Sequence, residues 1–287
     1  GPRAVGMGKI ALYTLGRAKC ARGCPDRGEC GAIPALYGGG ARYTAPEQVC
    51  AELDKLVACG LSTSVYFVDD NFIANKRAVR EMLPHLIEWQ KRNGYPLLLS
   101  CEATLNIAKR PEILELMREA AFTTIFCGIE TPDPAALKSI SKDHNMMVPI
   151  IGAIETLNGF GMEVVSGMII GLDTDTPDTG RFLQKFVEQS QIPLLTMNLL
   201  QALPRTPLWD RLKRERRLIE DDDERESNVD FRLPYDEVVA MWRECMHVAY
   251  QPDKLFERYE HKTGATLPNR LKLPNTTQRN PTRHNNR

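Results

Sequence analysis

Short apolar runs alternate with amphipathic stretches along the first two hundred residues of the chain. Six of these runs are as short as buried strands, at residues 10–15, 65–68, 97–99, 123–126, 164–170 and 194–200. Strand-length runs that alternate with helical patterns are typical of βα units, whose strands pair in parallel. The hydrophobic pattern therefore predicts an α/β fold built on a parallel sheet.

Apolar residues recur at helical spacing between these runs. They predict helices over residues 46–60, 76–89, 111–120, 148–160 and 180–189. Pro46 and Pro111 suit the first turn of a helix, and Gly60 and Gly161 suit its end. Six βα units are too few for a closed eight-stranded barrel, so we expect a partial (β/α)6 TIM-like barrel.

The pattern changes after Pro207. A charged helix is predicted over residues 208–218, an acidic run at 220–226 has the composition of a solvated linker, and amphipathic helices are predicted over 234–250 and 253–261. We therefore expect a barrel over residues 1–207, a C-terminal helical extension over 208–266 and a disordered tail over 267–287.

Charge and hydropathy limit the kinds of partner. The chain carries 37 basic and 37 acidic residues, so no net field attracts nucleic acid, and we expect a small-molecule substrate. No apolar run approaches the length that spans a bilayer, and the N-terminus lacks the apolar core of a signal peptide. These features predict a cytoplasmic protein that is not transmembrane. Because the chain begins with Gly-Pro rather than Met, we expect a fragment of a longer protein.

Polar residues directly follow nearly every predicted strand. They are Asp69, Asp70, Glu102, Glu130, Asp173 and Gln201. In a barrel of parallel strands the chemistry lies at the carboxyl ends of the strands, where these residues fall. The recurrence predicts a binding or catalytic site at that rim.

Three of the eight cysteines lie in one glycine-containing loop after the first predicted strand: Cys20, Cys24 and Cys30. Three neighbouring arginines favour the thiolate form, which is the form that binds soft metals. Three thiolates can hold an iron-sulfur cluster with one open iron, or most of a zinc site that takes its fourth ligand from elsewhere. Free thiols without a metal are the third interpretation of this loop.

Several further motifs follow the cysteine loop in order: FVDDNF at residues 67–72, CGIETPD at 127–133, GMIIG at 167–171 and QALPRTPL at 201–208. Together with the loop, they resemble the radical S-adenosylmethionine superfamily, and in particular its cobalamin-binding branch, the group of the hopanoid C-2 methylase. The similarity extends from about residue 33 to about residue 260.

This resemblance implies that Cys20, Cys24 and Cys30 hold a 4Fe-4S cluster whose open iron binds S-adenosylmethionine. One electron then cleaves the sulfonium into methionine and a 5′-deoxyadenosyl radical. The cofactor-binding residues implied by the resemblance are Asp69, Asp70, Glu102, Glu130, Gly167, Gly171 and Gln201. A methyltransferase-type reaction on an apolar, lipid-like substrate and an electron donor protein follow from the same resemblance, and cobalamin is a further possible cofactor although its upstream domain is absent.

The cysteine spacing departs from the superfamily pattern of three and then two intervening residues, because the second gap here contains five. One alignment accepts all three cysteines with a three-residue insertion. Another, anchored on residues 23–25, places Gly28 and Gly31 at cysteine positions and loses the cluster. We favour the first, because a decayed site would not be expected to retain Cys20 and Cys30 so close by. The alternative function is a degenerate, non-catalytic barrel that binds a small molecule or a partner without a cluster.

Overall fold

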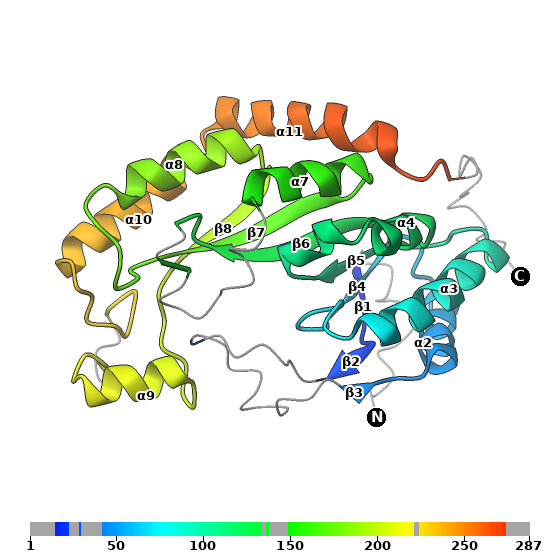
Figure 1. The fold of residues 1–287 in the computed structure, drawn as a ribbon, viewed down its shortest axis with the longest axis horizontal. Helices are drawn as coiled ribbons and strands as arrows, with labels where there is room; N and C mark the ends of the chain where they lie inside the picture. The colour runs from blue at the N-terminus through cyan, green and yellow to red at the C-terminus, as the bar shows by residue number, and fades with distance from the viewer. Residues whose placement is uncertain are drawn as a thin grey trace, which may run out of the picture.

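A parallel sheet forms the centre of the computed structural model, which describes residues 15–22, 29, 42–133, 136–137, 149–220 and 224–273 (Figure 1). Its order is β1-β4-β5-β6-β7-β8, so each strand pairs with the next one of the sheet along the chain. The strands are β1 (Leu15–Ala18), β4 (Ser64–Phe67), β5 (Leu98–Glu102), β6 (Phe122–Glu130), β7 (Glu163–Ile170) and β8 (Leu194–Leu199). All five pairings are parallel, which confirms the sequence prediction.

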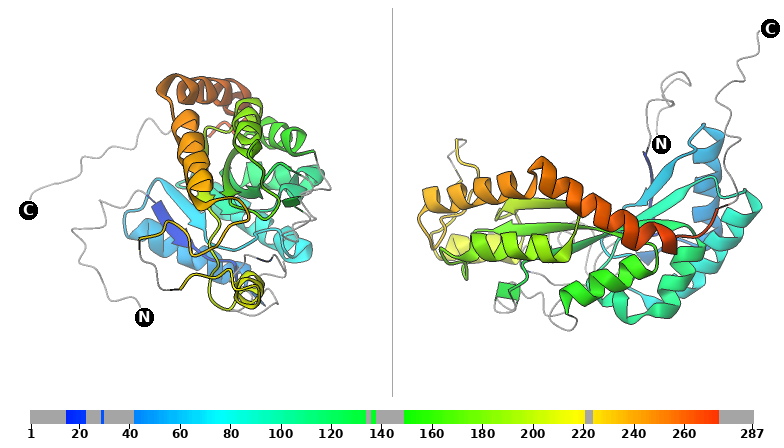
Figure 2. Two further views of the ribbon diagram at one scale, coloured as in Figure 1. Left: turned by 90° about the vertical axis from the view of Figure 1, so that its left-hand side faces the viewer. Right: turned by 90° about the horizontal axis from the view of Figure 1, so that it is seen from above.

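The sheet curls into an open half-barrel, as the two turned views show (Figure 2). The expected partial barrel is therefore confirmed. A short antiparallel pair, β2 (Ala21–Arg22) with β3 (Arg42–Tyr43), was not predicted, because two residues carry no detectable periodicity.

Helices cover the convex face of the sheet. They are α2 (Pro46–Ala58), α3 (Lys76–Arg92), α4 (Pro111–Glu119), α7 (Ile150–Gly159) and α8 (Thr179–Ser190), with a 3-10 helix η2 (Leu105–Lys109) before α4. Local chemistry explains their starts: the Asn75 side chain accepts the backbone N–H groups of Arg77 and Ala78, which caps α3. Pro46 and Pro111 occupy the first turns of α2 and α4, as the sequence predicted.

The two faces of the sheet differ in burial. The residues on the convex face are fully buried beneath the helices, among them Val65, Phe67, Leu99, Cys101, Ile125 and Cys127. Their neighbours in the strands, on the concave face, are half-buried or exposed. Cys101 and Cys127 are therefore core residues, and burial raises the pKa of Cys127 to about 12. The concave face is the one that remains available for a ligand.

The C-terminal extension consists of α9 (Pro207–Arg214), α10 (Tyr235–Ala249), α11 (Pro252–Thr266) and a 3-10 turn η3 (Leu267–Asn269). Helix α10 packs on α8 and on β8, the last strand of the sheet. Trp242 Nε1 donates to the Met197 carbonyl at 2.8 Å, and the Tyr250 hydroxyl donates to the Leu195 carbonyl. These side chains partner backbone groups of an edge strand, where unpaired groups would otherwise invite pairing with another chain.

The region after α9 differs from its predicted form. The helix expected over residues 208–218 ends at Arg214, because Arg216 takes a left-handed φ of 57° and Leu218 pairs with Val229 in a β-bridge. The described residues of the run interpreted as a solvated linker, 220 and 224–226, are exposed or half-buried, and packing resumes directly after it, where the buried Ser227 hydroxyl donates to the Leu200 carbonyl at 2.6 Å. Residues 221–223 lie outside the described part of the chain.

The segment expected to be a disordered tail begins with ordered structure. Its first residues form η3, and the Arg270 guanidinium donates to the Gly161 carbonyl at 3.2 Å. These polar contacts to the barrel are not visible in a composition rich in Asn, Thr and Arg. Residues 274–287 lie outside the described residues.

Candidate active site

The concave face of the half-barrel carries polar side chains at alternate strand positions. The residues of strands β4 to β8 that face the concave side include two without a polar side chain, Phe126 and Gly167. The polar ones are Tyr66, Ser100, Glu102, Glu130, Thr196 and Asn198. Asn198 Nδ2 lies 3.4 Å from Thr196 Oγ1, and the Tyr66 hydroxyl donates to Glu102 Oε1 at 2.8 Å. A polar face enclosed by the curvature of a sheet is typical of a ligand site. Tyr66, Thr196 and Asn198 were not predicted, because alternation alone does not say which face is concave.

Asp69, at the carboxyl end of β4, fixes the start of the cysteine loop. Its carboxylate accepts the backbone N–H of Cys20 at 3.2 Å and that of Ala21. Burial raises the pKa of this carboxyl to about 6, although the two hydrogen bonds oppose the rise. The Asp69 side chain thus holds Cys20, itself a buried residue, beside the end of β4.

The next residue, Asp70, presents a buried oxygen without a partner. Its Oδ2 receives no hydrogen bond from the described part of the chain. A buried carboxylate oxygen without a donor is costly, so this oxygen suits the ammonium group of a ligand. Glu102 lies at the end of the neighbouring strand. Its pKa is raised, because the effect of burial outweighs the opposing hydrogen bond from Tyr66.

Two features of β6 and β7 shape the middle of the concave face. A Cβ at Gly167 would lie 3.3 Å from both Phe126 Cζ and Thr196 Oγ1, so these two side chains pack closely over the glycine and leave little space for a side chain there. Glu130 has a left-handed φ of 65° beside a register shift between Gly128 and Glu130. Such strained backbone costs about 1–3 kcal/mol and concentrates at functional sites.

Gly171 and Gln201, two predicted cofactor-binding residues, make their contacts with the C-terminal extension. Gly171 has a φ of 100°, and a Cβ there would lie 2.4 Å from Phe231 Cε1. Gln201 Nε2 donates to the Glu226 carbonyl at 2.6 Å, and its Oε1 accepts the Asn228 backbone N–H at 3.3 Å. These contacts give both residues a structural role beside the predicted one.

Of the three predicted cluster ligands, Cys20 is described, and Cys24 and Cys30 lie outside the described residues. No group of three metal-ligating side chains is found in the described ranges. Cys20 has a raised pKa, caused first by burial and then by the nearby Asp69 carboxylate. A metal ion offsets such a penalty, because it binds the thiolate directly. The buried thiol of Cys20 therefore fits a metal-bound thiolate, and the unpartnered Asp70 oxygen fits the ammonium group of a ligand beside it.

The chain belongs to the radical SAM superfamily, whose family model matches residues 20–186. A second model, a domain of unknown function (DUF4070), matches residues 206–285.

The chain is 61% identical over 273 residues to the hopanoid C-2 methylase of Rhodopseudomonas palustris (strain TIE-1), covering 95% of this chain and 51% of that protein. It is 36% identical to an uncharacterized methyltransferase of Synechocystis sp., over 93% of this chain and 52% of the relative. It therefore spans about half the length of these relatives. The solved structure of the cobalamin-dependent S-adenosylmethionine radical enzyme OxsB, with aqua-cobalamin and S-adenosylmethionine bound, has the same fold, with a TM-score of 0.66 at 14% identity over 91% of this chain and 47% of OxsB.

No helix within the described ranges combines the length and the apolar character that crossing a bilayer requires.

Proposed function

We propose that this chain is the catalytic barrel of a radical S-adenosylmethionine methyltransferase that acts on an unactivated carbon of an apolar, lipid-like substrate. The observation that carries the proposal is the convergence of Cys20, Asp69, Asp70 and Glu102 at the carboxyl ends of adjacent strands. This arrangement, together with membership of the superfamily, supports an enzyme over a non-catalytic barrel.

In this proposal Cys20, Cys24 and Cys30 hold a 4Fe-4S cluster. When bound, the cluster supplies the electron that cleaves S-adenosylmethionine into methionine and a 5′-deoxyadenosyl radical. Asp69 holds the backbone of Cys20, and the unpartnered Asp70 oxygen accepts a hydrogen bond from the ligand's ammonium group.

The remaining predicted residues surround the nucleotide. Glu102 and Glu130 line the pocket from the ends of β5 and β6, and the backbone at Gly167, on the concave face of β7, borders the adenosyl group. Gly171 and Gln201 close the rim by holding the extension against it. A curved sheet that excludes water protects a radical from side reactions.

The substrate class rests on the relative named hopanoid C-2 methylase, and cobalamin on the relation to OxsB. An electron donor protein is the remaining partner, because the reaction consumes one electron. We place the enzyme in the cytoplasm, where a reducing environment keeps cysteine ligands reduced.

Anaerobic reconstitution with iron and sulfide tests the metal assignment. We expect the unsubstituted chain to retain about four irons and Cys20→Ala to lose most of them, because three thiolates anchor such a cluster. Cys50→Ala is the matched control: Cys50 is a half-buried cysteine on α2, and its removal should leave the iron content unchanged. Equal iron in Cys20→Ala and the unsubstituted chain would refute the assignment.

A further inference from the structure

Tyr66 connects two neighbouring strands across the concave face of the barrel. It lies half-buried in β4, and its hydroxyl donates to Glu102 Oε1, at the end of β5, at 2.8 Å. The two strands pair in parallel with Tyr66 opposite Ser100, so the bond reaches a residue two positions further along β5. A hydroxyl that donates to a carboxylate makes a charge-assisted hydrogen bond, which is stronger than a neutral one. The phenol of Tyr66 therefore sets the direction of the Glu102 side chain.

The main chain around Glu102 is also fixed from both sides. The Glu102 carbonyl accepts the backbone N–H of Phe72 at 2.8 Å, and the N–H of the next residue, Ala103, donates to the Phe126 carbonyl on β6 at 3.0 Å. With the backbone held by two neighbouring segments and one carboxylate oxygen held by the phenol, the side chain has little freedom left. Within the described ranges, the bond from the phenol is the one hydrogen bond that this carboxylate accepts. Its second oxygen therefore has a defined position and is available to a ligand.

A second carboxylate lies close to this one. Burial raises the pKa of Glu102, the hydrogen bond from Tyr66 opposes that rise, and the charge of Asp70 adds to it. The ammonium group of Lys19 acts in the opposite direction. Asp70 Oδ2 is buried and receives no hydrogen bond from the described part of the chain. Two nearby carboxylates that oppose each other's ionisation favour a ligand that carries positive charge.

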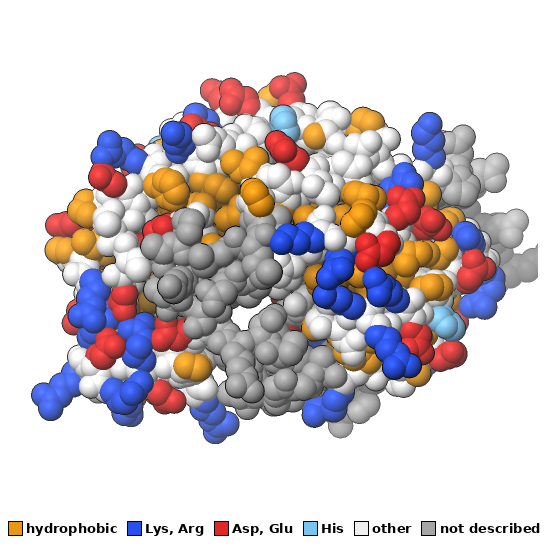
Figure 3. Space-filling view, in the orientation of Figure 1, with side chains coloured by type: hydrophobic (Ala, Val, Ile, Leu, Met, Phe, Trp, Pro, Cys, Tyr) orange, Lys and Arg blue, Asp and Glu red, His pale blue; other side chains and the backbone are white. Residues whose placement is uncertain are grey.

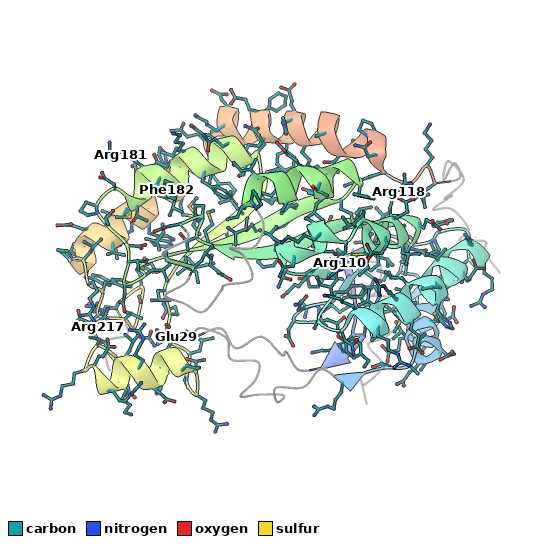
Figure 4. The ribbon with its side chains drawn as sticks, in the orientation of Figure 1. Glu29, Arg110, Arg118, Arg181, Phe182 and Arg217 are labelled. Carbon is teal, nitrogen blue, oxygen red and sulfur yellow. The ribbon has the colours of Figure 1, made fainter. Side chains whose placement is uncertain are left out.

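The two carboxylates belong to the barrel side of the molecule. Figure 3 shows this face hollowed below the sheet, between α9 and the β2–β3 pair. Arg211 and Arg217 of the extension are engaged elsewhere, because they pair with the two oxygens of Asp173 at 2.7 and 2.6 Å. Figure 4 shows Arg217 at the α9 end of the molecule, away from β4 and β5. A cationic ligand group that enters the hollow along β4 and β5 meets both carboxylates.

We propose that Tyr66 is a positioning residue for S-adenosylmethionine. By holding one oxygen of Glu102, it aims the other oxygen, together with the free oxygen of Asp70, at the positively charged methionine end of the ligand. The inference rests on the proposed function and deepens it, since it says which part of the ligand Glu102 meets. Tyr66 itself acts only through Glu102.

The test measures the affinity of the reconstituted chain for S-adenosylmethionine by equilibrium dialysis. The comparison ligand is 5′-methylthioadenosine, which keeps the adenosyl group but lacks the ammonium and sulfonium charges. We expect Tyr66→Phe to weaken the binding of S-adenosylmethionine about tenfold, the size of one charge-assisted hydrogen bond. The affinity for 5′-methylthioadenosine should stay unchanged, because the phenyl ring still fills its place on β4. Glu102→Ala should weaken the binding of S-adenosylmethionine at least as much, and adding Tyr66→Phe to it should cause no further loss.

Tyr250→Phe is the matched control. It also removes a hydroxyl that bonds the sheet, at the Leu195 carbonyl, but it lies at the end of α10 beside the edge of β8, and it should bind both ligands as the unsubstituted chain does. Equal affinity for S-adenosylmethionine in Tyr66→Phe and the unsubstituted chain would refute the positioning role and leave the proposed function standing. An equal loss for both ligands would also refute it, because general damage to the barrel gives that result. An unsubstituted chain that retains iron but binds no S-adenosylmethionine would overturn the proposed function and this inference together.

Discussion

Single residues of the GMIIG motif illustrate how one sequence feature serves two purposes. Gly167 lies within β7 and Gly171 directly follows that strand; both lack a side chain, but their surroundings differ. Gly167 has an ordinary φ and lies on the concave face beneath the Phe126 ring and the Thr196 hydroxyl. Gly171 combines a left-handed φ with the Phe231 ring directly against its Cα. The sequence predicted both glycines as ligand contacts, because the ring that packs on Gly171 comes from a segment sixty residues away.

We expect Gly171→Ala to destabilise the fold by roughly 2–4 kcal/mol, because it adds both left-handed strain and a clash with Phe231. Chemical denaturation of the iron-free protein measures this effect. Gly152→Ala, in the first turn of α7 with nothing within 4 Å of the added Cβ, should instead stabilise by about 0.5–1 kcal/mol. Similar unfolding free energies for the two variants would contradict the packing account.

At the scale of elements, the extension is a structural part of the barrel. Helix α10 supplies side-chain donors to the β8 edge, and residues 226–228 bond to the segment that follows β8. Periodicity predicted α10 within a residue of its bounds, since an amphipathic face is a local signal. It overextended α9, because the reversal at Arg216 depends on pairing between Leu218 and Val229 rather than on the helical pattern.

Replacing Trp242 by Phe tests the edge contact. The ring remains large and apolar, but the Met197 carbonyl loses its donor, and we expect the free energy of unfolding to fall by about 1–2 kcal/mol. Thermal or urea unfolding measures the loss. Phe256→Leu on α11 is the control, because Phe256 is 64% exposed and its change should stay within about 0.5 kcal/mol. An unaltered stability in Trp242→Phe would mean that water satisfies this carbonyl equally well.

At the scale of the whole molecule, the half-barrel brings together residues that are far apart in the chain. The six βα units were predictable because each is a local pattern. The strand-end acids were predictable because parallel strands share one carboxyl edge. The hydrogen-bonded ion pair between the Arg211 guanidinium and the Glu29 carboxylate was not predictable, because the two residues lie 182 positions apart in the chain and share no periodicity. Electrostatic contacts of this range become visible only once the chain is folded.

The central claim is that this barrel cleaves S-adenosylmethionine. The most direct measurement is the yield of 5′-deoxyadenosine when the reconstituted chain is given S-adenosylmethionine and dithionite under anaerobic conditions. The account predicts 5′-deoxyadenosine and methionine in equal amounts, and neither product from the iron-free chain. A chain that retains its iron, binds S-adenosylmethionine and forms no 5′-deoxyadenosine would contradict it.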